Sequence, residues 1–197
     1  MKSFLKNLTP NTSHLTPTRG GFTLIETFIA ITILMMVIVG PLTLAQRSLS
    51  SASLTKDKLT AYFLAQDAIE YIKKMRDDKV LGAVNTSGWT DFINGDIFDC
   101  SGNSNDVPQC TIDTLRDSSS AINHCTWGFC PYLKYYETRN SYGYVQGTPS
   151  PFKRGVKVML LDNGFGQNEM QVEVTVEWQS QGFGKQTVVL NGNLLNW

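Results

Sequence analysis

The side chain most able to do chemistry in the N-terminal part of the chain is one carboxylate, Glu26, at the front of a long apolar stretch. Residues 27–46 carry no formal charge and consist mainly of Phe, Ile, Leu, Met and Val. An ionised side chain costs about 2.5 to 3.5 kcal/mol at the centre of a membrane helix, so such residues usually have a partner and a function. The alternative is a charge that only snorkels to the lipid headgroups. Glu26 is therefore a candidate functional residue.

Four cysteines, Cys100, Cys110, Cys125 and Cys130, all follow the apolar stretch. Beyond a membrane anchor, an even number of cysteines indicates disulfides more readily than free thiols. Three pairings are possible, and we favour the short closures Cys100–Cys110 and Cys125–Cys130, because each would staple a loop that has little core of its own. A zinc site would need C-x2-C spacing, which only Cys125 and Cys130 approach, and no metal is expected.

Other catalytic patterns are weak. His14 and His124 are the two histidines, so a nucleophilic triad would depend on His124 alone, and a surface histidine is the better interpretation. The Gly-x-Gly sequences at 164–166 and 182–184 are more typical of hairpin turns than of phosphate-binding loops. We expect no catalytic residues, no cofactor and no enzyme activity.

Charge indicates orientation in a membrane. Lys2, Lys6 and Arg19 precede Phe22, which leaves 14 basic and 17 acidic residues from Phe22 onward. A basic N-terminal flank is typical of the cytoplasmic side, so everything after Arg47 is expected outside. The acidic excess beyond the leader argues against nucleic acid as a partner.

The apolar stretch has the length of a membrane anchor. Its 20 uncharged residues match the roughly 20 that a helix needs to cross a bilayer core. Pro41 follows Gly40 and removes the hydrogen bond to the carbonyl of Val37, so a kink or loosened turn is expected there. An ordinary secretory signal with cleavage after Ala45 is the weaker alternative, because the apolar run is too long for one.

The helix is expected to continue beyond the anchor as an amphipathic helix that ends at Gly82, so that it covers about residues 22–79. Its apolar stripe alternates steps of four and three residues, with Leu64 and Ile69 at its flanks. The stripe consists of Leu54, Lys58, Ala61, Ala65, Ala68, Ile72 and Met75.

The remainder of the chain predicts first a connecting region of loops and short strands, and then a sheet. Residues 82–130 are rich in Gly, Asn, Ser and Asp and show no lasting period. From Pro131 the pattern is β, most clearly in the alternation of Val172, Val174, Val176 and Trp178. A three- or four-stranded antiparallel meander, with its hairpin turn at 162–164, should offer its apolar face to the helix, which gives an α+β fold.

The N-terminal sequence Arg-Gly-Gly-Phe-Thr-Leu-Ile-Glu, residues 19–26, with its uncharged run behind it, closely resembles the class III signal of type IV prepilins and type II secretion pseudopilins. The helical segment 64–70, the Val-x-Val-x-Trp strand and the C-terminal Leu-x-Asn-Trp also resemble minor pilins and pseudopilins. The resemblance is strong over residues 16–80 and weak over residues 82–150.

This resemblance implies a pilin-like fold and cleavage by a membrane prepilin peptidase between Gly21 and Phe22, with N-methylation of Phe22. It implies that Glu26 neutralises the new amine on a neighbouring subunit and so sets the register of assembly. Gly40 and Pro41 would mark where the anchor helix loosens as subunits pack into a filament.

The implied organisation has five segments: a cleaved basic leader at 1–21, a transmembrane half-helix at 22–48, an amphipathic half-helix at 49–81, a cysteine-containing loop region at 82–130 and an antiparallel sheet at 131–197. Residues 49–197 would form one exported domain. The expected product is a minor structural subunit, first a single-pass inner-membrane precursor and then part of a pilus, pseudopilus or DNA-uptake fibre. Its partners would be the peptidase, other subunits and an inner-membrane assembly platform. The rivals are a membrane-anchored extracytoplasmic binding protein and a secreted protein cleaved after Ala45.

Overall fold

The computed structural model describes residues 20–83, 88–102, 107–126, 129–161, 169–180 and 182–196. Most of the expected leader, the expected turn at 162–164 and the Gly-x-Gly at 164–166 lie outside these residues. The chain divides into two compact units, Met1–Gln46 and Arg47–Trp197, and each is described by itself.

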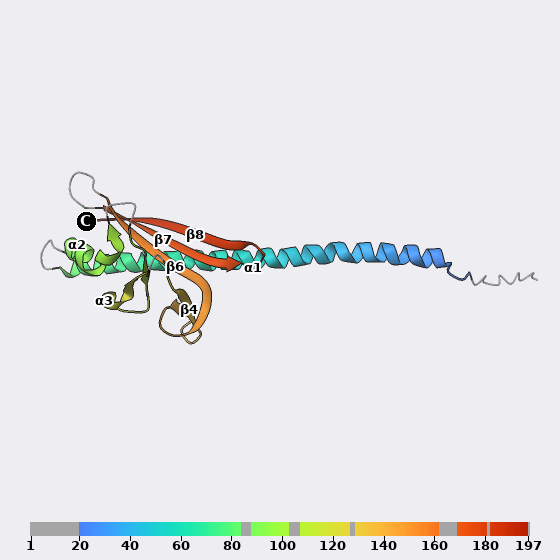
Figure 1. The fold of residues 1–197 in the computed structure, drawn as a ribbon, viewed down its shortest axis with the longest axis horizontal. Coiled ribbons are helices and arrows are strands. Elements are labelled where there is room, and N and C mark those ends of the chain that lie inside the picture. Colours follow the sequence, from blue (N-terminus) through green and yellow to red (C-terminus); the bar gives the residue numbers. More distant parts are fainter. Residues whose placement is uncertain are drawn as a thin grey trace, which may run out of the picture. The chain divides into compact units, whose positions relative to one another are not determined.

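Helix α1, Leu24–Gly82, is 59 residues long and contributes to both units (Figure 1). It contains Pro41 and is unbroken there, so the loosened turn at Gly40 and Pro41 stays a prediction. In the second unit its buried residues form one stripe, as expected from Ala61 onward. They are Ala61, Leu64, Ala65, Ala68, Ile69, Ile72 and Met75.

Two residues of the expected stripe are not buried. Leu54 is partly exposed and Lys58 is exposed. The turn between the last two strands, which begins after Ser180, lies near this part of α1, where Asp57 and Ser180 line one hollow.

The three longest strands form the antiparallel meander expected from their alternating residues. They are β6, Thr148–Leu161, β7, Glu169–Ser180, and β8, Gly184–Leu195 (Figure 1). Strand β7 is central: Val174 lies opposite Val156 of β6 and Leu190 of β8. Among the described residues, β8 pairs only with β7, so its outer edge has no partner strand.

The expectation of three or four strands is wrong, because the described residues form an eight-stranded sheet. Five short strands join it through the edge of β6 that faces away from β7, and three of them come from the supposed loop region. One pairing, β1 with β6, is parallel. The short strands are β1, Ser101–Gly102, β2, Cys110–Ile112, β3, Ile122–His124, β4, Tyr132–Tyr136, and β5, Ser141–Gly143.

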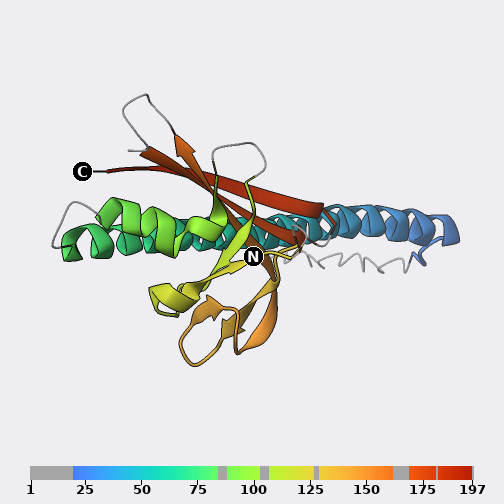
Figure 2. The same cartoon turned by 60° about the vertical axis from the view of Figure 1, so that its left-hand side comes forward.

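The region after α1 also contains short helical segments that have no period long enough to be seen in the sequence. Near the C-terminal end of α1 lie α2, Gly88–Asp91, and η1, Phe92–Asp96 (Figure 2). Two further turns are η2, Phe98–Cys100, and α3, Ser118–Ala121. Trp89 and Phe92 are buried and join the core, so this region adds to the apolar interior.

The core of the second unit lies between α1 and the inner face of the sheet. Along β7 the inward residues, from Met170 to Trp178, are buried, while the residues between them remain partly exposed. Gly192 of β8 permits close packing, because a Cβ there would lie 3.2 Å from Cγ2 of Ile69. Helix and sheet thus form the α+β arrangement expected from the sequence.

Candidate functional site

Residues 20–26, the described part of the motif at 19–26, lie at the start of α1 and are exposed. Gly20, Gly21 and Phe22 precede the helix, and the Phe22 side chain is 80% exposed. A Cβ atom at either glycine would meet no heavy atom within 4 Å. Exposed, irregular backbone is the kind of chain that proteases cut most readily. The bond between Gly21 and Phe22 is therefore accessible.

Thr23 and Glu26 come together in the first turn of α1. The amide of Glu26 donates to the carbonyl oxygen of Thr23 at 3.0 Å and to its Oγ1 at 3.3 Å, and the amide of Thr27 donates to the same carbonyl at 3.2 Å. Thr-x-x-Glu is the capping-box pattern, and a carboxylate in the first turn complements the positive end of the helix dipole. Glu26 is exposed and so is also free to meet a group from another chain.

The side chains in the apolar half of α1 are exposed. Among the described residues, α1 is the one helix long and apolar enough to cross a membrane, and none of its most apolar window is buried. Ile25, Phe28, Met36 and Leu44 are each 67–79% exposed. Such a continuous apolar surface needs lipid or another protein around it.

The hydroxyls within this half are satisfied by the helix itself. Thr27 donates to the carbonyl of Leu24, Thr32 to that of Ile29 and Thr43 to that of Gly40, each at 2.8 Å. An unsatisfied polar group in hydrocarbon costs several kcal/mol, so these bonds make the polar residues compatible with a bilayer. The helix is consistent with a single-pass membrane anchor.

Both disulfides are the short closures expected from the sequence. Cys100 is bonded to Cys110, which ties η2 to β2, and Cys125 is bonded to Cys130. His124 is exposed, and its Nδ1 lies 4.0 Å from Sγ of the oxidised Cys110. In the described part of the chain, no group of three or more His, Cys, Asp or Glu side chains could hold a metal ion.

A buried arginine, Arg154, was missed by the sequence interpretation. Its side chain is fully buried between β6 and α1. It donates to the carbonyl oxygens of Leu64 at 2.9 Å and Ile112 at 2.5 Å, and its Nη1 lies 3.1 Å from Oδ2 of Asp67. Thr114 donates to the same carboxylate oxygen at 2.8 Å. The arginine therefore joins helix, sheet and the β2–α3 connection.

The signal for Arg154 was the alternation of β6 itself. Val156 and Val158 were expected to point inward, and a period of two carried back along the strand places Arg154 and Phe152 on the same face. Both are buried. A charge at an inward position predicts a polar network, since a buried guanidinium needs several acceptors.

Two partly buried tyrosines donate hydrogen bonds to backbone carbonyls. The Tyr71 hydroxyl donates to the carbonyl of Arg116 at 2.5 Å. Burial raises the pKa of Tyr71, and the carboxylates of Asp117 and Asp113 raise it further. Tyr144 donates to the carbonyl of Arg154 at 3.2 Å; burial raises the pKa of Tyr144, although the Arg154 guanidinium lowers it in part. Both hydroxyls are held protonated.

Comparisons of the chain with protein-family models, with curated proteins and with solved structures found no match.

Proposed function

We propose that the chain is a structural, pilin-like subunit: a minor pilin or pseudopilin precursor that is cut between Gly21 and Phe22. The observation that carries the proposal is the motif at 19–26, whose residues 20–23 lie on exposed chain directly before a helix long and apolar enough to span a membrane. The precursor would be an inner-membrane protein with its N-terminus in the cytoplasm, and Phe22 would be N-methylated after cleavage. The mature protein would then enter a type IV pilus or a type II secretion-like pseudopilus.

Glu26 supplies the chemistry of assembly. Cleavage creates a positive amine on Phe22, and a carboxylate that approaches this amine on a neighbouring subunit removes the cost of two unpaired charges in an apolar environment. Because the Glu26 side chain is exposed in the single chain, such a contact needs no rearrangement of the second unit. A head-to-tail contact of this kind does not close on itself and so generates a filament.

The exposed apolar half of α1 suits both environments that this role requires. Its side chains can face lipid in the precursor and neighbouring helices in the filament, since the two surroundings are about equally apolar. Gly40 and Pro41 would allow the helix to loosen between the two states. The partners proposed are a prepilin peptidase, other pilin or pseudopilin subunits and an inner-membrane assembly platform. Catalysis, a cofactor and nucleic-acid binding have no part in this role.

Mass spectrometry of the mature N-terminus tests this function against its rivals. We expect a chain that begins at methylated Phe22, whereas an anchored binding protein would begin at Met1 and a secreted protein at Gln46. Ala45 lies inside α1, and a signal peptidase would have to unwind that helix to cut after it.

A pair of glycine variants sharpens the test. Gly21→Ala should block maturation, whereas Gly20→Ala is the matched control, because neither added Cβ meets another atom within 4 Å. A structural disturbance would affect both variants alike, so selective loss with Gly21→Ala reports recognition by the peptidase. A mature-sized Gly21→Ala product would count against the proposal.

A further inference from the structure

Phe129 is an exposed aromatic residue directly before Cys130, which is bonded to Cys125. The amide of Phe129 donates to the carbonyl of Thr126 at 2.9 Å, so Thr126 and Phe129 are joined by a backbone bond beside the disulfide. The Phe129 side chain is nevertheless 75% exposed. A rigidly presented aromatic residue is a typical interaction anchor, since little conformational entropy is lost when it binds.

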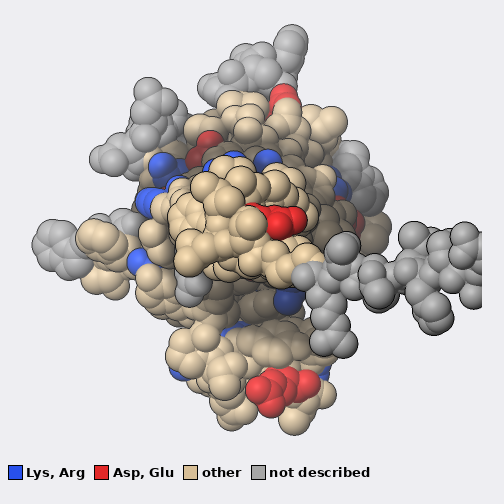
Figure 3. All heavy atoms as spheres, turned by 90° about the vertical axis from the view of Figure 1, so that its right-hand side faces the viewer, with Lys and Arg blue, Asp and Glu red and all other residues tan. Residues whose placement is uncertain are grey.

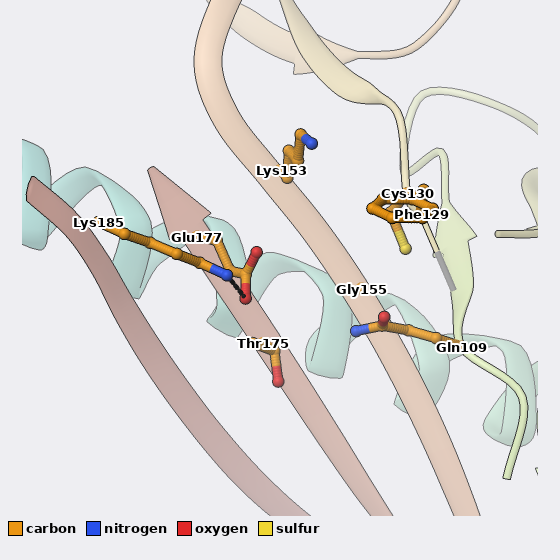
Figure 4. A pocket seen from close by; sticks show the side chains of 8 residues that line it. All are labelled: Gln109, Phe129, Cys130, Lys153, Gly155, Thr175, Glu177 and Lys185. Atoms are coloured by element: carbon orange, nitrogen blue, oxygen red, sulfur yellow. Dashed lines mark ion pairs between the residues drawn. The ribbon is translucent and has the colours of Figure 1, made fainter. Parts of the chain in front are cut away.

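Phe129 lines one of two hollows on the outer face of the sheet, and the two hollows share three side chains. The first, of about 270 Å³, is lined by Phe129, Cys130, Gln109, Lys153, Gly155, Thr175, Glu177 and Lys185 (Figure 4). The second, of about 190 Å³, shares the side chains of Lys153, Glu177 and Lys185 and adds Tyr132, which is 53% exposed. Together they form one groove, which we name the outer groove, with an aromatic residue in each part.

Gly155 leaves room for the Gln109 side chain on the floor of the outer groove. The Gln109 amide lies across Gly155, and a Cβ there would be 2.0 Å from its Nε2, so any larger residue would displace this side chain (Figure 4). The Gln109 amide and the Thr175 hydroxyl offer hydrogen-bonding groups along the floor.

The charge of the outer groove is positive. Lys185 pairs with Glu177 at 2.8 Å, whereas Lys153 has no carboxylate within ion-pair distance in the described part of the chain. Its ammonium instead lies 4.5 Å from the centre of the Tyr132 ring. Two ammonium groups therefore face one carboxylate, and a bound anion would have a favourable partner in Lys153.

We infer that the outer groove binds an extended acidic peptide segment of a partner protein, with an apolar side chain of that segment against Phe129. The exposed aromatic residues Phe129 and Tyr132, one in each hollow, and the excess of one ammonium group over carboxylates fit a segment that carries both apolar and acidic residues. A lipid surface or a nucleic acid would need a larger basic cluster, typically 4–8 Lys or Arg for lipid. On the face that Figure 3 displays, basic side chains are scattered among uncharged ones. This inference does not depend on how the N-terminus is processed.

Fluorescence anisotropy with the full chain in detergent micelles tests the outer groove. The probe is a labelled peptide, Glu-Phe-Glu-Val-Glu-Phe, and the comparison peptides are Lys-Phe-Lys-Val-Lys-Phe and Glu-Ser-Glu-Ser-Glu-Ser. We expect the probe to bind with a Kd of about 10 µM and both comparison peptides to bind at least about tenfold more weakly, because charge and apolar contact are both required.

Two variants and two matched controls assign the contact. Phe129→Ser should raise the Kd about tenfold, and Lys153→Gln should raise it about threefold at low salt and less at high salt. The controls are Phe98→Ser, at another exposed phenylalanine, and Lys157→Gln, four residues further along β6 and outside both hollows. These controls should leave the Kd unchanged.

The inference is overturned if the probe fails to bind at 1 mM, a limit of about −4 kcal/mol. Equal effects of the groove variants and their controls would overturn it too, as would equal binding of the basic peptide. Binding of anionic phospholipid vesicles in place of the probe, weakened by the same two variants, would assign the groove to a lipid surface and contradict the peptide.

Discussion

Replacement of Arg154 by Met should strongly destabilise the second unit. The variant keeps much of the side-chain volume but removes the donors to the carbonyls of Leu64 and Ile112, both of which lie in buried surroundings. The Leu64 carbonyl keeps its helical donor within α1, so the Ile112 carbonyl is the acceptor that the variant leaves unsatisfied. An unsatisfied buried acceptor costs about 1–3 kcal/mol, and part of this is recovered because a guanidinium no longer has to be desolvated. We expect the free energy of unfolding to fall by about 1–3 kcal/mol.

Loss of the other partner should cost much less. The Asp67 side chain is 52% exposed, so its ion pair with Arg154 is screened by water, and Asp67→Asn should cost no more than about 1 kcal/mol. The Thr114 hydroxyl can still donate to the amide oxygen of this variant. The structure therefore predicts a large difference between two variants of one ion pair.

Urea unfolding of the full chain in detergent micelles measures this difference. Trp89 and Trp178 are 5% and 3% exposed, so their fluorescence reports loss of the core. Lys153→Met, one residue along β6 and on the outer face, is the control and should stay within about 0.5 kcal/mol. An Asp67→Asn variant as unstable as Arg154→Met, or an Arg154→Met protein as stable as the parent, would refute the argument that buried carbonyls carry the cost.

Three further predictions follow from the sites described above. Glu26→Ala should be processed normally but enter filaments at least about tenfold less than the parent, as seen on immunoblots of sheared fibres, and normal incorporation would exclude the assembly role. Replacing Cys125 and Cys130 with Ser should lower the free energy of unfolding by about 2 kcal/mol in the chain-entropy model and weaken peptide binding to the outer groove. An unchanged melting temperature would contradict a stabilising role of this disulfide. The pKa values of Tyr71 and Tyr144 are raised above the ordinary value of 10, so their contribution to stability is complete below pH 10 and is lost as the pH rises beyond it. The melting temperature should therefore fall as the pH rises above 10, and fall less steeply in Tyr71→Phe.

The sequence predicted the parts of the fold whose pattern is long. Helix α1 was visible because its apolar stripe repeats over several turns from Ala61 to Met75, and β7 because its alternation runs through five inward residues. Both disulfides are the short closures favoured among the three possible pairings, although the sequence alone could not choose between them. Within the motif at 19–26, the structure shows a capping contact between Thr23 and Glu26. The Thr-x-x-Glu pattern in the sequence is typical of such a contact.

The parts that were not predicted depend on partners distant in the chain. Short strands were expected among residues 82–130, but β1, β2 and β3 have two or three residues each, too few for a period that would place them. They are strands because β6 offers an edge to β1 and β2. Burial of Arg154 could be inferred only by extending the alternation of β6 through a charged position. The outer groove was invisible because it combines residues from four segments, 109, 129–130, 153–155 and 175–185.

The outer edge of β8 is a site at which the protein could aggregate. In the described part of the chain this 12-residue strand has a partner on one edge only, and an open strand edge is a template for pairing with another extended chain. Thr187 to Leu190 is an uncharged run of high β propensity. Directly after it come Asn191, Gly192 and Asn193, residues that disfavour strands. The glycine that lets Ile69 approach the sheet thus also interrupts a segment prone to aggregation, and a bulkier residue there would be expected to lower soluble yield as well as loosen the core.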